Sequence, residues 1–239
     1  IAYTEGLGIV KKIAMENLQD QMNSKKEDSA KIKFAPVAPG QVAVVAVSPG
    51  EGLTRIFASL GAAAVVSGGQ TMNPSVKEIV AAFENLPTDK IIILPNNKNI
   101  ILAAQNAAKV SVKQIAVIPT RNAPQGFAAM LRLLPEGTLS ENEESMKEAI
   151  TEVHTGEITT ATRDVTIDDV HVEKNSVIAL LDGKLIISTH SIDDALARLL
   201  STAKVEDFER ITLFYGEDMI LPRVNQMVDK IRETYPDHE

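Results

Sequence analysis

The sequence predicts an α/β fold in which parallel strands alternate with helices, followed by a region of mixed α+β structure. Between residues 42 and 134 the chain repeats one pattern four times: a short apolar run, a polar loop and an amphipathic helix. Parallel strands covered on both faces read as unbroken apolar runs. Because their crossovers are right-handed, the four loops should meet at one edge of one sheet. After Pro135 the pattern changes, which predicts a second structural region.

The four expected strands are the apolar runs at residues 42–47, 63–66, 90–94 and 114–118. The helix after the first run is predicted from apolar residues at the i, i+3, i+4, i+7 spacing, which are Leu53, Ile56, Phe57 and Leu60. The segment 76–83 repeats this spacing, and the segment 100–109 is rich in Ala, which suits close packing on a sheet. Pro124 is expected to open the fourth helix.

The start of the second helix has two competing signals. Asn73 is a good N-cap residue, and Pro74 would then occupy the first helical position. Ser75 and Glu78 have the spacing of a capping box, which would start the helix two residues later. The sequence leaves both starts open.

The region after Pro135 should contain two helices, a hairpin and further strands. Asp182-Gly183 lies between two apolar runs, and this dipeptide favours the positive φ angles of a tight hairpin turn. The expected elements are a helix over 140–153, strands over 157–165, 177–181, 184–188 and 211–215, a helix over 191–200 and a final helix over 224–231. We therefore expect a parallel-sheet domain at 37–135 and an α+β domain at 136–239, with residues 1–36 as a linker or the tail of a preceding domain.

Composition and charge exclude several classes of function. The chain has a net charge of -8 and no Trp, so neither a phosphate backbone nor stacked bases should bind to it. It has no Cys, which excludes disulfides, thiol catalysis and zinc-thiolate sites. No apolar run approaches the ~20 residues of a membrane span. These features fit a cytoplasmic protein, and because the chain begins with Ile1, we expect it to be part of a longer one.

The loop after the second strand is the strongest candidate binding site. Paired glycines permit unusual backbone angles, and the start of the next helix exposes free amides that suit a carboxylate or phosphate. The candidate residues in this loop are Gly68, Gly69, Gln70, Thr71, Asn73 and Ser75. The alternative is a capped helix start after a tight turn, with no ligand.

Polar side chains also follow the third and fourth strands. The candidates are Asn96, Asn97, Lys98 and Asn99 in one loop, and Thr120, Arg121, Gln125 and Gly126 in the other. Arg121 could form a bidentate pair with a carboxylate or phosphate, or a salt bridge to a neighbouring domain. His154 is a further candidate at a helix–strand junction, although a hydrogen-bonded loop histidine would explain it equally. No histidine spacing indicates a metal site, and no ATP-binding motif is visible.

These loops carry a specific resemblance to a known family. The segments 68–75, 92–100 and 119–126, followed in order by 154–157 and by Arg163-Asp164, resemble the C-terminal region of fatty acid kinase A. That family is also described as dihydroxyacetone-kinase-like or YloV-like. The resemblance runs from about residue 37 to the end, and it implies a DegV-like arrangement of two domains.

The resemblance also implies a function for the longer protein. Such proteins carry an N-terminal kinase domain that binds ATP and Mg²⁺, and they phosphorylate a fatty acid held by a DegV-like fatty-acid-binding protein. This region would dock that partner and contact the chain's own kinase domain, with no catalysis and no cofactor of its own. The alternatives are a regulatory domain that binds a carboxylate, phosphate or lipid, and the substrate domain of a dihydroxyacetone-type kinase. A homodimer is also allowed.

Overall fold

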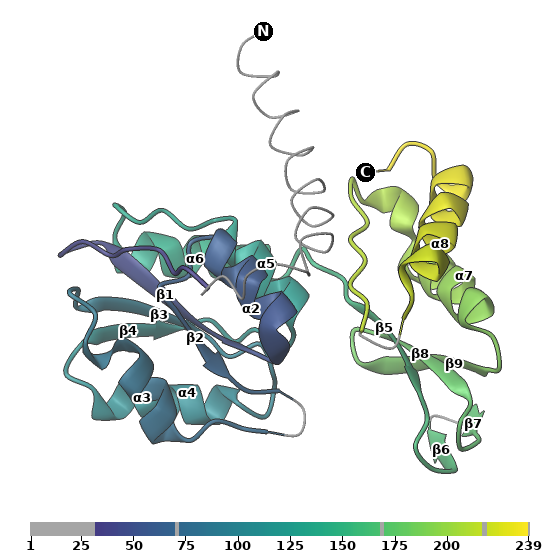
Figure 1. Cartoon of the computed structure of the whole chain (residues 1–239), viewed down its shortest axis with the longest axis horizontal. Coiled ribbons are helices and arrows are strands. Elements are labelled where there is room, and N and C mark those ends of the chain that lie inside the picture. The colour runs from purple at the N-terminus through teal and green to yellow at the C-terminus, as the bar shows by residue number, and fades with distance from the viewer. Residues whose placement is uncertain (1–31, 70–71, 168–169, 217–218, 239) are drawn as a thin grey trace, which may run out of the picture.

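The chain folds into two lobes, which Figure 1 shows on either side of the molecule. The computed structural model describes residues 32–69, 72–167, 170–216 and 219–238. Most of the expected segment 1–36 therefore lies outside the described residues, as do Gln70 and Thr71. We call the part that contains β1–β4 and α2–α6 the first lobe, and the part that contains β5–β9, α7 and α8 the second lobe.

A four-stranded parallel sheet forms the centre of the first lobe, as the sequence predicted. Its strands lie in the order β2-β1-β3-β4, and every pairing is parallel. The strands are β1 (Val42–Ser48), β2 (Ala64–Ser67), β3 (Lys90–Leu94) and β4 (Gln114–Val117). All seven residues of β1 are buried, because helices cover the sheet on both faces.

Five helices cover the two faces of this sheet. They are α2 (Gly50–Ser59), α3 (Val76–Glu84), α4 (Ile101–Val110), α5 (Ala123–Met130) and α6 (Leu139–Ala149). Figure 1 shows α2, α5 and α6 on one face and α3 and α4 on the other. Successive residues of β1 alternate between the two cores, since Val44 packs with Phe57 of α2 whereas Val45 packs with Ile79 of α3.

Helix α6 packs with the first lobe, although it follows the boundary expected at residue 135. Met146 is fully buried in the same apolar cluster as Phe57. The Asn142 side chain accepts a hydrogen bond from the Leu134 amide at 2.8 Å and donates to the carbonyls of Leu134 and Thr138, each at 2.9 Å. The packing of the first lobe therefore continues to the end of α6.

The helix starts follow the local capping chemistry. Ser75 and Glu78 form a reciprocal capping box, so α3 begins at Val76 and the later of the two expected starts is observed. The hydrogen bonds from Ser75 lower the pKa of the Glu78 carboxyl. Asn122 caps α5 by accepting a hydrogen bond from the Gln125 amide, and Pro124 lies in the first turn.

The second lobe combines antiparallel strands with two helices. Its elements are β5 (Gly156–Thr160), β6 (Val165–Ile167), β7 (Val170–Val172), β8 (Val177–Leu181), β9 (Lys184–Thr189), α7 (Ile192–Ala203), a 3₁₀ turn (Val205–Asp207) and α8 (Leu221–Thr234). Strands β5, β8 and β9 form one antiparallel sheet, and β6 pairs with β7. The expected hairpin turn is confirmed, because Asp182 and Gly183 have φ angles of 51° and 79°.

The strand expected at residues 211–215 is wrong. The structure assigns residues 211–216 to no strand or helix. Ile211 and Leu213 nevertheless pack into the apolar cluster that contains Leu196 and Met227, from α7 and α8. The alternating pattern thus reports one buried side of an extended segment, because alternation is set by burial and does not require a neighbouring strand.

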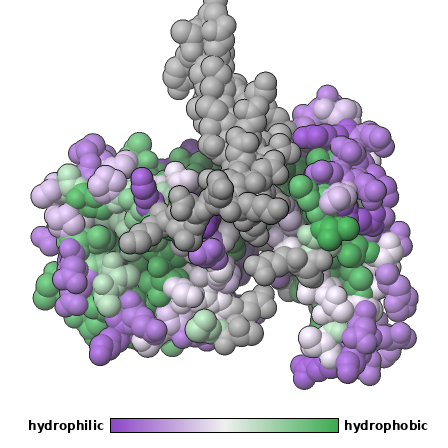
Figure 2. Space-filling view, viewed as in Figure 1, coloured by the Kyte–Doolittle hydropathy of each residue, from purple (hydrophilic) through white to green (hydrophobic). Residues whose placement is uncertain are grey.

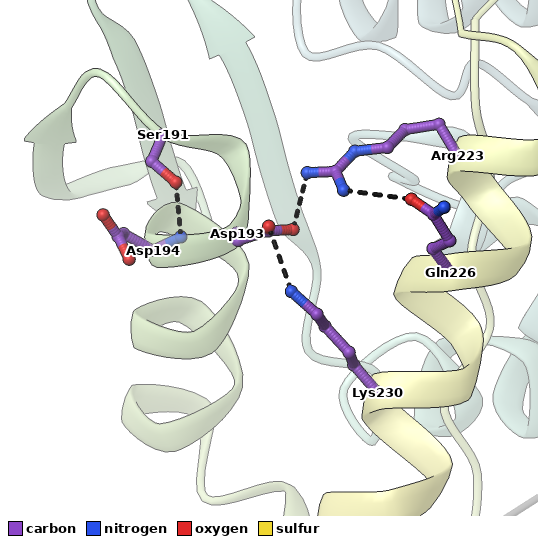
Figure 3. A network of polar contacts seen from close by, with 6 residues as sticks. All are labelled: Ser191, Asp193, Asp194, Arg223, Gln226 and Lys230. Carbon is purple, nitrogen blue, oxygen red and sulfur yellow. Dashed lines mark hydrogen bonds and ion pairs between the residues drawn. The ribbon is translucent and has the colours of Figure 1, made fainter.

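A cluster of charged side chains joins α7 to α8 (Figure 3). Asp193, in the first turn of α7, lies 2.8 Å from the Arg223 guanidinium and 3.1 Å from the Lys230 ammonium, both of which belong to α8. These two hydrogen bonds, with Arg223 the larger contributor, lower the pKa of the Asp193 carboxyl below its ordinary value of 3.8. The ionised carboxylate therefore stabilises the contact between the two helices.

We predict that Asp193→Asn lowers the free energy of unfolding by about 1 kcal/mol at pH 7, a typical size for a partly exposed ion pair. The folded-state pKa is depressed, so this stabilisation is complete above the unfolded pKa and is lost as the pH falls through the folded pKa. Urea unfolding of the variant and the original chain at pH 7 and below pH 3 measures the difference, which should vanish at the lower pH. Asp194→Asn is the matched control, since it removes one charge from the same helical turn. An equal loss in both variants would contradict the assignment.

Candidate functional site

The candidate loops of the first lobe meet at one edge of the parallel sheet. We call this edge the rim; it consists of residues 48–50, 67–75, 95–100 and 118–122, which follow β1, β2, β3 and β4. Because all four strands are parallel, their carboxyl ends lie side by side. In Figure 1 these ends point toward the second lobe. The convergence that the sequence predicted is therefore present in the described parts of these loops.

Asn96 ties three strand ends together at the rim. Its side-chain Nδ2 donates a hydrogen bond to the Val47 carbonyl at the end of β1, at 2.9 Å. Its backbone amide donates to Thr120 Oγ1 after β4, also at 2.9 Å. Asn96 has a φ angle of 53°, which asparagine tolerates better than most residues. Asn96 and Thr120 are both buried, so their polar groups act as structural links within the rim.

Gly126 lets α5 approach this link closely. A Cβ atom at Gly126 would lie 2.2 Å from Asn96 Oδ1 and 2.9 Å from Cζ of Phe57. Real Cβ atoms do not approach other atoms so closely, so the position requires glycine. Gly68 and Gly69 meet similar constraints, because a Cβ at either would lie under 3 Å from a side-chain atom of Pro74 or Pro49. The candidate glycines thus serve the packing of the rim.

Two oxygens in the rim are buried without a hydrogen-bond partner among the described residues. They are Ser48 Oγ, at the end of β1, and Asn96 Oδ1. Buried polar atoms usually have a partner, so these two are the rim atoms best suited to bond with solvent or a ligand. Sequence reasoning did not select Ser48. The signal that could have found it is a hydroxyl residue at the carboxyl end of a wholly apolar strand.

The loop after β3 is partly structural and partly exposed. Asn97 is buried, and its Oδ1 accepts a hydrogen bond from the Asn99 amide at 2.9 Å, which shapes the turn into α4. Lys98 and the Asn99 side chain are exposed at the surface of the rim. Asn73 and Ser75 are exposed in the loop before α3, where Ser75 serves as the helix cap.

The loop after β4 is held by Gln125. Its Oε1 accepts a hydrogen bond from the Arg121 amide at 2.8 Å, and its Nε2 donates to the Ile150 carbonyl at 3.4 Å. Arg121 itself is exposed, and its guanidinium makes no ion pair with another residue that the structure describes. The rim therefore presents two cations, Arg121 and Lys98, on loops that are fixed by neighbouring side chains.

His154 does not belong to the hydrogen-bond network of the rim. Its Nδ1 lies 2.6 Å from Asp182 Oδ2, and the other oxygen of Asp182 accepts a hydrogen bond from the Thr155 amide. The ring of Phe208 lies at its edge, with 5.2 Å between the ring centroids. These contacts connect the start of β5 to the β8–β9 turn. The structure supports the alternative of a hydrogen-bonded loop histidine.

A second polar surface lies in the second lobe, away from the rim. This groove is lined by His171, Glu173, Ser176, Ser188, Thr189 and His190. Within the ranges that the structure describes, no three His, Asp or Glu side chains are grouped closely enough to hold a metal ion. The same ranges contain no helix with the length and apolar character needed to cross a membrane.

We predict that Gly126→Ala lowers the free energy of unfolding by about 1–3 kcal/mol, because the added methyl group would overlap Asn96 and Phe57 in a packed core. Thermal and urea unfolding measure the change. Gly52→Ala in α2 is the control, since its Cβ would meet nothing within 4 Å and alanine favours a helix. A Gly126→Ala variant as stable as Gly52→Ala would refute the proposed close approach.

Comparisons with known proteins agree with this architecture. A DegV family protein from Corynebacterium glutamicum superposes with a TM-score of 0.58 at 17% sequence identity, covering 81% of this chain and 85% of that one. At this identity the similarity establishes the fold alone. The chain therefore has a DegV-like α/β fold, in which a parallel sheet is followed by antiparallel sheets.

Sequence relatives cover the whole chain. An uncharacterized protein of Staphylococcus aureus (strain USA300) is 36% identical over 240 residues, which is 99% of this chain and 43% of that protein. A protein of Staphylococcus epidermidis is 36% identical over 241 residues, or 44% of its length. The chain thus spans less than half the length of these relatives. The family model for the FakA-like C-terminal domain of fatty acid kinase matches residues 43–239, and the chain belongs to this family.

Proposed function

We propose that this chain is the partner-recognition region of a phosphotransferase that phosphorylates a protein-bound fatty acid, and that it has no catalysis of its own. The family to which it belongs supports the fatty acid kinase context. The observation that carries the recognition role is the division of labour in the rim. Asn96, Asn97 and Gln125 are engaged in holding the loops together, whereas Arg121 and Lys98 are exposed and unpaired within the described structure.

The chemistry of these two cations indicates the surface that they would meet. An arginine guanidinium presents a planar set of donors that matches a carboxylate in two parallel hydrogen bonds. Lys98 adds a second positive charge at the same edge, on a chain whose net charge is -8. A partner with carboxylate side chains at its docking surface would fit this local inversion of charge. The partner we propose is a DegV-like fatty-acid-binding protein.

A fixed rim would assist phosphoryl transfer by positioning. Catalysis of this reaction depends on alignment of donor and acceptor and on neutralisation of charge. Holding two reactants in register can remove up to about 7–11 kcal/mol of the barrier in favourable systems. ATP and Mg²⁺ would bind to the kinase domain of the longer protein, and this region would hold the acyl carrier beside that domain. Loops tied by buried hydrogen bonds suit this task, because they lose little conformational entropy on binding.

A second candidate function is recognition of a small ligand that regulates the kinase. The observation in its favour is the pair of buried oxygens without partners, Ser48 Oγ and Asn96 Oδ1. A ligand that donates hydrogen bonds, such as a hydroxyl or a protonated carboxylic acid, would satisfy them. Binding of free fatty acid in the absence of the carrier protein would favour this candidate over docking.

We predict that Arg121→Ala weakens the affinity for the fatty-acid-binding partner about 10-fold, the loss expected when a central interface arginine is truncated. Titration calorimetry with the full-length kinase and the loaded partner measures the dissociation constant. Arg121→Lys should recover part of the affinity, since it retains the charge but not the planar donor geometry.

Lys109→Ala is the control for this measurement. Lys109 is an exposed cation in the last turn of α4, which lies at the opposite edge of the sheet from the rim. Its removal changes the net charge equally and should leave the affinity unchanged. An unchanged dissociation constant for Arg121→Ala, or an equal change for Lys109→Ala, would overturn the proposed docking surface.

A further inference from the structure

Three aromatic rings form a continuous row from the core of the first lobe to the second lobe. Phe57 of α2 is fully buried, and its ring centroid lies 4.5 Å from that of Phe127 of α5. Phe127 lies in turn 5.2 Å from Phe214, which belongs to the second lobe. The planes are tilted by 36° and 34° in the two pairs, so the contacts are neither flat stacks nor edge-on.

The last of these contacts differs from the rest of the apolar packing. Each hydrophobic cluster of the described residues draws its members from one lobe, two clusters in the first and two in the second. The Phe127–Phe214 contact instead joins the lobes directly. Figure 2 shows apolar surface on the side of the second lobe that faces the first, whereas its outer side is largely hydrophilic. The exposed apolar residues of the second lobe include Phe214, Tyr215, Ile220 and Leu221.

The backbone around Phe214 explains how its ring is presented. Ile211 and Leu213 pack into the core of the second lobe, so in an extended segment the ring of Phe214 is directed away from that core. No sheet pairing holds this segment. Phe214 is 43% exposed despite its contact with Phe127, so the contact covers part of the ring.

The other end of the row reaches the rim. Phe127 directly follows Gly126, whose α-carbon lies against Asn96 and Phe57. Asn96 in turn links the ends of β1, β3 and β4. A displacement of Phe127 would therefore press on the residue that holds the rim loops in place, because close-packed interiors transmit small shifts.

We infer that Phe214 is a latch that holds the second lobe closed against the first, and that it connects the lobe arrangement to the rim through Phe127, Gly126 and Asn96. An aromatic pair contributes enough, beyond its buried area, to change a two-state equilibrium about 2- to 10-fold. A contact of this size stabilises the closed arrangement without fixing it permanently. The latch gives binding at the rim and movement of the lobes a shared structural element.

The test measures the distance between the lobes in solution. The chain has no Cys, so labels can be attached at chosen positions. Lys109→Cys in the first lobe and Asp229→Cys in the second place two dyes at exposed sites for single-molecule energy transfer. Phe214→Ala should lower the ratio of closed to open molecules about 2- to 10-fold, while circular dichroism shows both lobes folded. Phe214→Tyr, which retains the ring, should keep the original distribution.

Ile220→Ala is the matched control, since Ile220 is an apolar residue of the same lobe that is 69% exposed. It should leave the distance distribution unchanged. If Phe214→Ala unfolds the second lobe, Phe214→Leu replaces it under the same criteria. The inference fails if the folded variant keeps the original distribution, or if Ile220→Ala shifts it equally. The link to the rim fails if the Asn96 side-chain amide signals in NMR do not move in the Phe214 variant.

Discussion

The hydrogen bonds of Asn96 are the constraint on which the geometry of the rim depends. One residue, in a left-handed backbone conformation, links the ends of three parallel strands through its side chain and its backbone amide. Both bonds are buried, where an unpaired polar group would cost about 1–3 kcal/mol. The neighbouring helix adapts to this link through Gly126, and its aromatic residue Phe127 passes the contact to the second lobe. The position of the exposed cations is a consequence of these buried contacts.

Much of the fold was predictable because burial leaves a direct record in the sequence. Strands covered on both faces must be apolar throughout, so β1 and β3 could be located from composition alone. The Asp182-Gly183 turn was predictable from its backbone requirements. The segment around Ile211 was not, because an extended segment with one buried side has the same pattern whether or not a strand pairs with it. Local sequence also does not show that α6 packs on the first sheet.

The candidate site was predictable in location but not in detail. Sheet topology places the loops at one edge, and this follows from the order of strands and helices. The division between structural and exposed side chains depends on contacts between loops that lie far apart in the sequence. Asn96 and Thr120 are 24 residues apart, and Asn96 and Val47 are 49 apart. A row of four asparagine and lysine residues therefore could not be sorted into links and surface groups before the structure was known.

Hydrogen–deuterium exchange of the full-length kinase, with and without the loaded fatty-acid-binding protein, tests the role of the rim most directly. The docking proposal predicts that the partner slows exchange in the exposed loop segments 97–100 and 120–123, while the opposite edge of the sheet, around residues 110–113, exchanges at its original rate. Slower exchange confined to the opposite edge, or to the groove lined by His171 and His190, would contradict the proposal.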